Sequence, residues 1–119
     1  MPKILIIEDE PDMAETIKMF VEREGFSAES TTDAMAGIEK LQSFDVLLLD
    51  LIMPKMSGRA VLAEIKKRKL KTPVIVLSAV GLPVTVGEEL RKAYPNVRFV
   101  PKTEMYTDLI PAIKSALKD

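Results

Sequence analysis

The sequence predicts a doubly wound α/β fold, with five parallel strands and five helices in three α/β/α layers. Short apolar runs recur along the chain, and segments with helical spacing of their apolar residues separate them. Runs that are apolar throughout are typical of strands buried on both faces of a parallel sheet. The alternation of strands and helices favours helices on both sides of that sheet. At 119 residues, the chain has the length of one domain, residues 1–119.

The first third of the chain is expected to form two strands and the helix between them. Residues 3–7 form the first strand, and Pro11 suits the first turn of the helix that follows. Gly25 is expected to end that helix, and residues 26–30 alternate weakly, as a strand would. The apolar positions expected on the inner face of the helix are Ala14, Ile17, Phe20 and Val21.

The second helix and the central strand come next. Thr32 is expected to cap the helix, and the central strand covers residues 45–49. The strand is followed directly by Asp50, a carboxylate at the end of an apolar run. The inner face of the second helix is expected to hold Ala34, Met35, Ile38 and Leu41.

Ser57 or Gly58 is expected to open the third helix, with Val61, Leu62 and Ile65 facing inward. A fourth strand follows at residues 74–77. The next stretch is interrupted by Gly81, Pro83 and Gly87, so only a short helix is expected, at residues 88–94.

The chain closes with a fifth strand at residues 97–100 and a last helix at residues 108–117. Leu109, Ile113 and Leu117 face inward in that helix. Pro111 fits only if it falls in the first turn, because a proline in a helix interior removes a hydrogen bond.

Composition narrows the classes of function. The 17 basic and 18 acidic residues leave a net charge of −1, which gives no electrostatic signature of a protein that binds nucleic acid or an anionic membrane. No apolar run approaches the ~20 residues of a membrane span, and the start MPKILIIEDE is not a secretory signal, so a cytoplasmic protein is expected. Because the chain has neither Cys nor His, disulfides and imidazole-dependent triads are excluded. Oxygen ligands alone favour Mg²⁺, Mn²⁺ or Ca²⁺ over zinc.

Polar residues follow four of the five expected strands. Glu8 and Asp9 follow the first strand, Asp50 the third, Ser78 the fourth and Lys102 the fifth. The carboxyl ends of parallel strands meet at one edge of the sheet, where open α/β sheets bind their ligands. These residues are therefore expected to share one crevice. Unrelated turn residues are the alternative, but four matching strand ends argue against it.

This set of groups predicts phosphoryl chemistry. Three carboxylates at close range repel by roughly a few kcal/mol per pair, and a hard cation such as Mg²⁺ offsets that repulsion. Ser78 and Lys102 are expected to clamp the oxygens of an incoming phosphoryl group. Asp50 is the expected nucleophile, which forms an acyl phosphate.

The chain resembles, over its whole length, the receiver domains of two-component response regulators of the chemotaxis type. The segments that carry the resemblance are ILIIEDE, LLLDLIMPKMSG, PVIVLSA and FVPK. The resemblance implies a flavodoxin-like sheet and transfer of a phosphoryl group to Asp50 from a sensor histidine kinase or phosphotransfer protein. It also implies control of an output protein or domain, without direct nucleic-acid or membrane contact. Such a domain is no enzyme beyond its own phosphorylation and slow dephosphorylation.

The resemblance also assigns metal ligands. Glu8, Asp9 and Asp50 would arrange the Mg²⁺ together with the backbone carbonyl of Ile52.

For the phosphorylated state, the resemblance implies that Ser78 hydrogen-bonds one phosphoryl oxygen and Lys102 pairs with another. Phe99 matches an aromatic residue that turns inward when that hydroxyl moves toward the phosphate. A plain core aromatic is the alternative for Phe99.

The sequence departs from the family pattern in three places. The family usually has a cis Lys-Pro bond after the fifth strand, whereas here Pro101 precedes Lys102 and Thr103 follows it. A cis bond before a residue other than proline costs roughly 3 kcal/mol, so Lys102-Thr103 is expected to be trans.

The region of the expected fourth helix lacks the pattern that is usual in the family. The surface that contacts output partners is therefore the least transferable part of the resemblance. The resemblance also implies that Ile52 and Val80 flank the path of the hydrolytic water, and their apolar side chains predict slow dephosphorylation.

Other functions are weaker interpretations of the same sequence. A haloacid-dehalogenase-type hydrolase needs a second acid two residues after the nucleophile, where this chain has Ile52. A flavin-binding module is disfavoured because acidic residues follow the first strand, where a phosphate loop is required. A receiver-like module that binds partners without phosphorylation stays open. The basic run KKRKLK at residues 66–71 fits the solvated end of the third helix better than a nucleic-acid patch.

Overall fold

The computed structural model of the protein describes residues 1–50, 57–78 and 84–118. In this part of the chain, strands and helices alternate from the first residues to the last. The strands are β1 (Lys3–Ile7), β2 (Ser27–Thr31), β3 (Val46–Asp50), β4 (Val74–Ser78) and β5 (Val97–Pro101). The helices are α1 (Pro11–Arg23), α2 (Ala34–Lys40), α3 (Gly58–Lys67), α4 (Val84–Ala93) and α5 (Met105–Lys118), with short 3₁₀ turns at Leu41–Ser43 and Lys102–Glu104.

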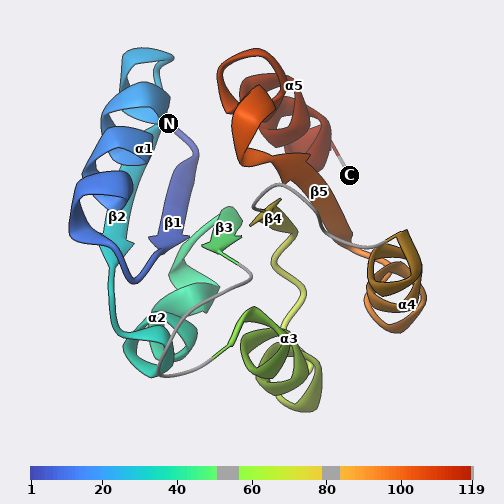
Figure 1. The fold of residues 1–119 in the computed structure, drawn as a ribbon. Coiled ribbons are helices and arrows are strands. Elements are labelled where there is room, and N and C mark those ends of the chain that lie inside the picture. The colour runs from blue at the N-terminus through green and yellow to red at the C-terminus, as the bar shows by residue number, and fades with distance from the viewer. Residues whose placement is uncertain (51–56, 79–83, 119) are drawn as a thin grey trace.

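All five strands lie parallel in one sheet, in the order β2-β1-β3-β4-β5. Helices α1 and α5 cover one face of the sheet, and α2, α3 and α4 cover the other (Figure 1). The three-layer, doubly wound α/β fold predicted from the sequence is confirmed. Among the described helices, none has both the length and the apolar character needed to cross a bilayer.

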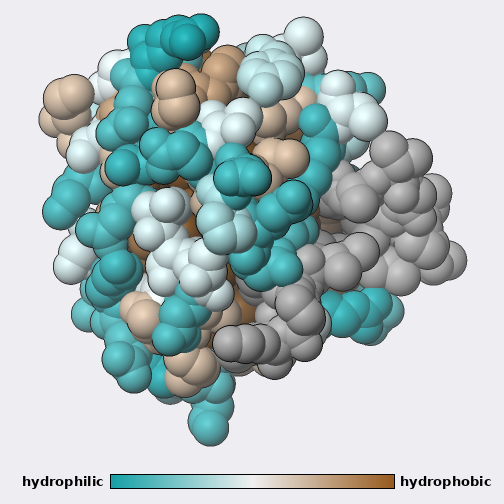
Figure 2. Space-filling view, turned by 60° about the vertical axis from the view of Figure 1, so that its left-hand side comes forward, coloured by the Kyte–Doolittle hydropathy of each residue, from teal (hydrophilic) through white to brown (hydrophobic). Residues whose placement is uncertain are grey.

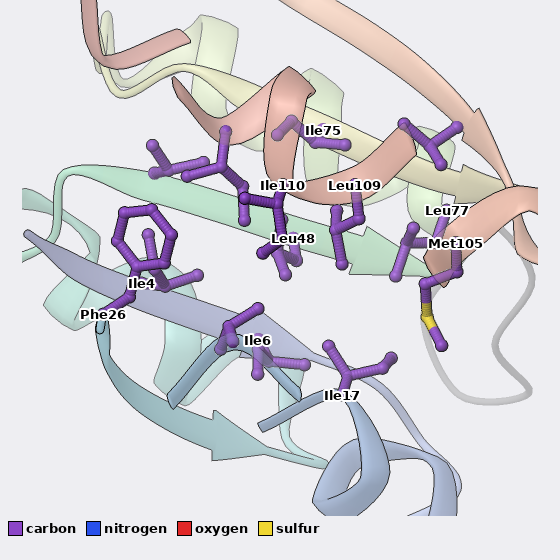
Figure 3. Close-up of a cluster of buried hydrophobic side chains, with 14 of the residues drawn as sticks. Ile4, Ile6, Ile17, Phe26, Leu48, Ile75, Leu77, Met105, Leu109 and Ile110 are labelled. Atoms are coloured by element: carbon purple, nitrogen blue, oxygen red, sulfur yellow. The ribbon is translucent and has the colours of Figure 1, made fainter. Parts of the chain in front are cut away.

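The apolar strand runs fill two cores, one on each face of the sheet. Along β3, Leu48 faces the core under α1 and α5, whereas Leu47 and Leu49 face the core under α2 and α3. Figure 3 shows the first core, in which Ile17 of α1 and Leu109 of α5 meet the central strands. Burial on both faces is the reason that no polar residue interrupts these strands.

Helix α2 approaches the sheet closely where β1 ends. A Cβ atom at Gly37 would lie only 2.7 Å from Cδ1 and 2.9 Å from Cγ1 of Ile7, which is fully buried. A side chain at position 37 would therefore displace the last residue of β1, which precedes the acidic pair. The glycine permits the contact that holds this end of β1 in place.

The start and the inner face of α2 differ from the sequence prediction. Asp33, not Thr32, caps the helix, because its Oδ1 accepts a hydrogen bond of 3.1 Å from the Ala36 N–H. The expectation that Met35 faces inward is wrong, since 40% of its surface is exposed. With Ala34 as the first helical residue, the inward stripe continues through Gly37 and Ile38, and Met35 lies to one side of it.

Helices α4 and α5 both begin earlier than predicted. Helix α4 begins at Val84, so Gly87 lies inside it and does not interrupt it. Helix α5 begins at Met105 because Met105 and Leu109 are buried on the same face. Pro111 therefore lies in the helix interior, and the expectation of a first-turn proline is wrong. The proline is exposed, which leaves its side of the helix open to water.

The surface is that of an ordinary globular domain on the face shown in Figure 2, where hydrophilic residues predominate and apolar ones are scattered. Among the residues with described side chains, the exposed large apolar ones are Met1, Met19, Met35 and Tyr106. They come from the amino terminus, α1, α2 and α5, and the Tyr106 ring meets the Phe20 ring of α1 edge-on, with 5.1 Å between the ring centroids.

Candidate functional site

The carboxyl edge of the sheet collects acidic groups from two neighbouring strands. Glu8 and Asp9 follow β1 directly, and Asp50 is the last residue of β3. The two strands are neighbours in register, with Ile7 opposite Leu49, so their ends lie side by side. One carboxylate oxygen from each of the three residues lies within 4.8 Å of the other two. We refer to Glu8, Asp9, Asp50 and Lys102 as the acidic edge.

Lys102 places a positive charge beside these carboxylates, although it follows β5, which is separated from β3 by β4. It begins the 3₁₀ turn that follows β5. Its Nζ lies 3.5 Å from Oε2 of Glu8 and 3.6 Å from Oδ2 of Asp50. No cis peptide bond occurs among the described residues, so the Lys102-Thr103 bond is trans, as expected. Lys102 therefore lies near both carboxylates with a trans peptide bond after it.

Burial at this edge is strong for two of the acids. Glu8 is 1% exposed and Asp50 is 6% exposed, whereas Asp9 is only partly buried. The Glu8 backbone N–H donates to the Thr31 carbonyl of β2 at 3.2 Å, which holds the residue after β1 in the line of the sheet. The side chain of Glu8 is consequently fixed inside the crevice.

Burial and neighbouring charges shift the pKa of one acid at this edge. Burial, followed by the negative charge of Asp50, raises the pKa of Glu8 from 4.5 to about 7, although Lys102 acts in the opposite direction. Burial and the charge of Asp50 together therefore outweigh the effect of Lys102 and disfavour the ionised form of Glu8. A further cation at this position would favour the ionised form of Glu8.

The donor set fits a hard divalent cation. Three carboxylates from adjacent strand ends offer oxygen ligands only, which is the chemistry that Mg²⁺ or Ca²⁺ requires. The raised pKa of Glu8 agrees with this, because a bound cation would offset the burial and the Asp50 charge that disfavour the ionised form of Glu8. The acidic edge can therefore hold a metal ion.

The remaining predicted site residues lie elsewhere or outside the described residues. Ser78 ends β4 opposite Pro101 in register, which places its backbone beside the residue that precedes Lys102. Ile52 and Val80 lie outside the described residues, as does the backbone carbonyl assigned to the metal.

Phe99 lies in β5 and packs partly buried against the core under α2 and α3. The guanidinium carbon of Arg91, in α4, lies 5.0 Å from the centroid of the Phe99 ring. This cation–π contact was not predicted from the sequence, because the limits of the fourth helix were unclear and no local pattern links the two positions. The contact joins α4 to the strand that carries Lys102 at its end.

Comparison with known proteins gives one consistent answer. Residues 4–114 match the family model described as the response regulator receiver domain. The chain is 38% identical over 81 residues to the cell cycle response regulator CtrA of Brucella abortus, an alignment that covers 66% of this chain and 35% of the relative. The chain thus spans about a third of the length of the curated relatives it matches.

Solved structures agree over nearly the full chain. A response regulator receiver domain protein from Clostridium thermocellum is 28% identical, with a TM-score of 0.83 over 99% of this chain and 95% of that one. The Francisella response regulator 1452 receiver domain is 26% identical, with a TM-score of 0.85 over 99% and 98% of the two chains.

Proposed function

Because the chain belongs to the response regulator receiver domain family, we propose that it accepts a phosphoryl group on Asp50. The observation that carries the proposal is the position of Asp50 at the tip of the central strand. It is buried, 3.6 Å from the Lys102 ammonium and within a cluster of three carboxylates. A buried carboxylate, an ammonium group and a carboxylate cluster therefore lie at one strand end, which supports the proposal.

The reaction is a displacement at phosphorus. An Oδ atom of Asp50 attacks the phosphorus of a phosphohistidine on a sensor kinase or phosphotransfer protein. The new P–O bond forms as the P–N bond breaks, and the histidine nitrogen leaves with its electron pair. Phosphorylation at this position adds negative charge beside Lys102, which can turn from Glu8 to a phosphoryl oxygen over a similar distance.

The other acids have supporting roles in this proposal. Glu8 and Asp9, together with Asp50 and the backbone carbonyl at Ile52, would hold Mg²⁺, with Mn²⁺ as a substitute. When bound, the ion offsets the charge that develops on the phosphoryl oxygens. Glu8 must lose its proton for that role, and its raised pKa therefore links phosphorylation to pH.

The phosphorylated domain is proposed to act by a change of conformation. Ser78 hydrogen-bonds a phosphoryl oxygen, and Phe99 turns inward in response. Since the Arg91 guanidinium now covers the ring, this movement breaks the contact between α4 and β5. The altered surface controls an output protein or domain, and the product of the reaction is a state of the protein.

The direct experiment measures the intact mass after incubation with acetyl phosphate and MgCl₂. We expect a gain of one phosphoryl group in the native chain and none in Asp50→Asn or in a chelated sample. Asp12→Asn is the matched control, because Asp12 is an exposed acid in the first turn of α1 and lies outside the carboxylate cluster. A gain that survives Asp50→Asn contradicts the proposal.

The same sample tests the lifetime predicted from Ile52 and Val80. Neither side chain has a polar atom with which to orient a water molecule. We expect the phosphorylated form to decay over many minutes in the presence of Mg²⁺ and without a phosphatase. Decay within seconds contradicts this part of the proposal.

A further inference from the structure

A pocket of ≈ 330 Å³ opens at the amino edge of the sheet, between the carboxyl-terminal ends of α3 and α4. This edge is opposite to the one that carries Asp50. Its volume is within the range of small ligand-binding pockets. The pocket, which we name the apolar hollow, has mainly apolar walls formed by Leu62, Ile65, Leu70, Val74, Tyr94 and Val97.

A second pocket of ≈ 340 Å³ adjoins the first, and Lys71, Pro95 and Asn96 line both. We name it the basic hollow, because its remaining walls are Pro73 and the cation Arg98. The two hollows together form an elongated site, with an apolar part and a polar, cationic part side by side. This shape suits an extended ligand better than a compact one.

Positive charge gathers around this site although the whole chain has a net charge of −1. The run at residues 66–71 contains five cations and no acid, and residues 90–98 add three more without an acid. Lys66 and Arg68 have partners within the protein, the Ala93 carbonyl and the Glu64 carboxylate. In the described part of the chain, the side chains of Lys69 and Lys71 form no hydrogen bond or ion pair. Their ammonium groups are open to a ligand with negative charge.

The backbone at Lys69 gives an independent indication. Lys69 has a φ of 57°, in the left-handed region that glycine occupies at most helix ends of this kind. Its N–H donates to the Lys66 carbonyl and the Leu70 N–H donates to the Ile65 carbonyl, which closes α3 with a Schellman motif. A glycine at position 69 would relieve the strain of a side chain here. The lysine thus occupies a strained position at the mouth of the apolar hollow, which points to a use for its ammonium group.

We propose that the two hollows bind an acidic peptide segment of a partner protein. One apolar side chain of the peptide enters the apolar hollow, and its carboxylates lie beside Lys69, Lys71 and Arg98. Charge complementarity argues for this ligand, because the site has cations on its rim and no carboxylate among its described lining residues. A nucleic acid fits less well, since the Lys66 ammonium lies over the Tyr94 ring, 5.6 Å from its centroid, where a base would stack.

The test uses a fluorescein-labelled synthetic peptide with one Trp between Asp and Glu residues, and fluorescence anisotropy as the readout. Two matched peptides replace the Trp by Ser, or the acids by Asn and Gln. A single-stranded DNA oligonucleotide of equal net charge is the fourth probe. We expect the acidic Trp peptide to bind, both matched peptides to bind about tenfold more weakly, and the DNA to bind no better than they do. In ¹⁵N-HSQC spectra, the shifts should cluster in residues 62–74 and 93–98.

Variants of the chain locate the site. We expect Lys71→Glu to weaken peptide binding about tenfold, whereas Lys67→Glu, an exposed residue of α3 that lines neither hollow, changes it by less than about threefold. Lys69→Gly should raise the melting temperature and weaken peptide binding. A purely structural Lys69 would change only the melting temperature. Asp50→Asn should bind the peptide as the native chain does, which separates this site from the phosphoacceptor.

Several results overturn the proposal. These are an absence of HSQC shifts at millimolar peptide, equal binding of the Trp and Ser peptides, equal effects of Lys67→Glu and Lys71→Glu, or tighter binding of the DNA.

Discussion

The two edges of the sheet carry opposite charges, and these charged groups differ in burial and in whether they have ion-pair partners. At the carboxyl edge, Glu8 and Asp50 are buried and close enough to Lys102 for ion pairs. At the amino edge, Lys69 and Lys71 are exposed, and in the described part of the chain their ammonium groups form no hydrogen bond or ion pair. Both edges are formed by the ends of the same parallel strands, so the fold alone does not set the difference.

The comparison shows that burial determines which charged groups are sensitive to a neighbouring charge, a proton or a bound ion. At the acidic edge, burial and the charge of Asp50 raise the pKa of Glu8 to about 7. Such a group responds to a proton, a metal ion or a phosphoryl group. The exposed cations of the amino edge, Lys69 and Lys71, are solvated and screened, so they suit the recognition of a charged partner.

The largest expected effect comes from removing the central cation of the acidic edge. Lys102→Met should slow phosphorylation by acetyl phosphate about a hundredfold, because no ammonium is then left to pair with the phosphoryl oxygens. Lys71→Met removes a cation from the opposite edge and should leave the rate within about twofold. Initial rates measured by intact mass give the comparison. Equal rates for the two variants would show that the edges do not differ in this way.

The second expected effect concerns stability and pH in the metal-free protein. The pKa of Glu8 is raised in the folded state, so the folded protein binds more protons than the unfolded chain between pH 4.5 and about 7. Stability from this group is thus fully present below pH 4.5 and is lost as the pH rises to about 7. Glu8→Gln, which stays neutral, should be more stable than the native chain above that range by up to about 3 kcal/mol.

Urea unfolding at several pH values measures this difference. Glu15→Gln is the matched control, since Glu15 is an exposed acid of α1 and should show no such dependence. A Glu8→Gln variant that loses stability relative to the native chain as the pH rises contradicts the sign.

The proximity of the residues at the acidic edge was predictable from the sequence for a topological reason. Once the apolar runs are taken as parallel strands, their ends must meet, and the residues Glu8, Asp50 and Lys102 are brought together without knowledge of any side-chain contact. The burial of Glu8, and hence its raised pKa, depends on tertiary packing and was not predictable from the strand pattern.

The two hollows at the amino edge were not predicted, because two segments that are distant in the sequence form them. The run at residues 66–71 fits a solvated helix end when it is considered alone, and its lysines are largely exposed. The apolar hollow is lined both by Leu70, after α3, and by Tyr94 and Pro95, after α4. Helix α4 was also the element with the least clear limits, since Gly87 suggests a break that the burial of Leu90 overrides.

The third expected effect is stabilisation by Mg²⁺. At an ion concentration about ten times the dissociation constant, binding should add about 1.4 kcal/mol to the free energy of unfolding. Asp9→Asn should lose most of this gain, and Lys69→Gly, at the other edge, should keep it. Thermal unfolding with and without MgCl₂ measures the gain. An equal gain in both variants would mean that the ion does not bind at the acidic edge.

The smallest expected effect lies between the two edges, at the contact of Arg91 with Phe99. A double-mutant cycle with Arg91→Gln and Phe99→Leu should give a coupling of about 0.5–1 kcal/mol in the unphosphorylated protein. The coupling should vanish after phosphorylation, if Phe99 turns inward. A second cycle with Arg68→Gln and Phe99→Leu serves as the control, because Arg68 pairs with Glu64. A coupling unchanged by phosphorylation contradicts the role of Phe99 in the switch.

The most direct test of the central claim identifies the residue that carries the phosphoryl group. Borohydride reduces an acyl phosphate of aspartate to homoserine, so the modified position survives digestion and can be sequenced by tandem mass spectrometry. After incubation with acetyl phosphate and MgCl₂, we expect homoserine at position 50 and unchanged residues at positions 8 and 9. Reduction at Glu8 or Asp9, or at no position while the intact mass shows phosphorylation, would contradict the assignment of Asp50 as the phosphoacceptor.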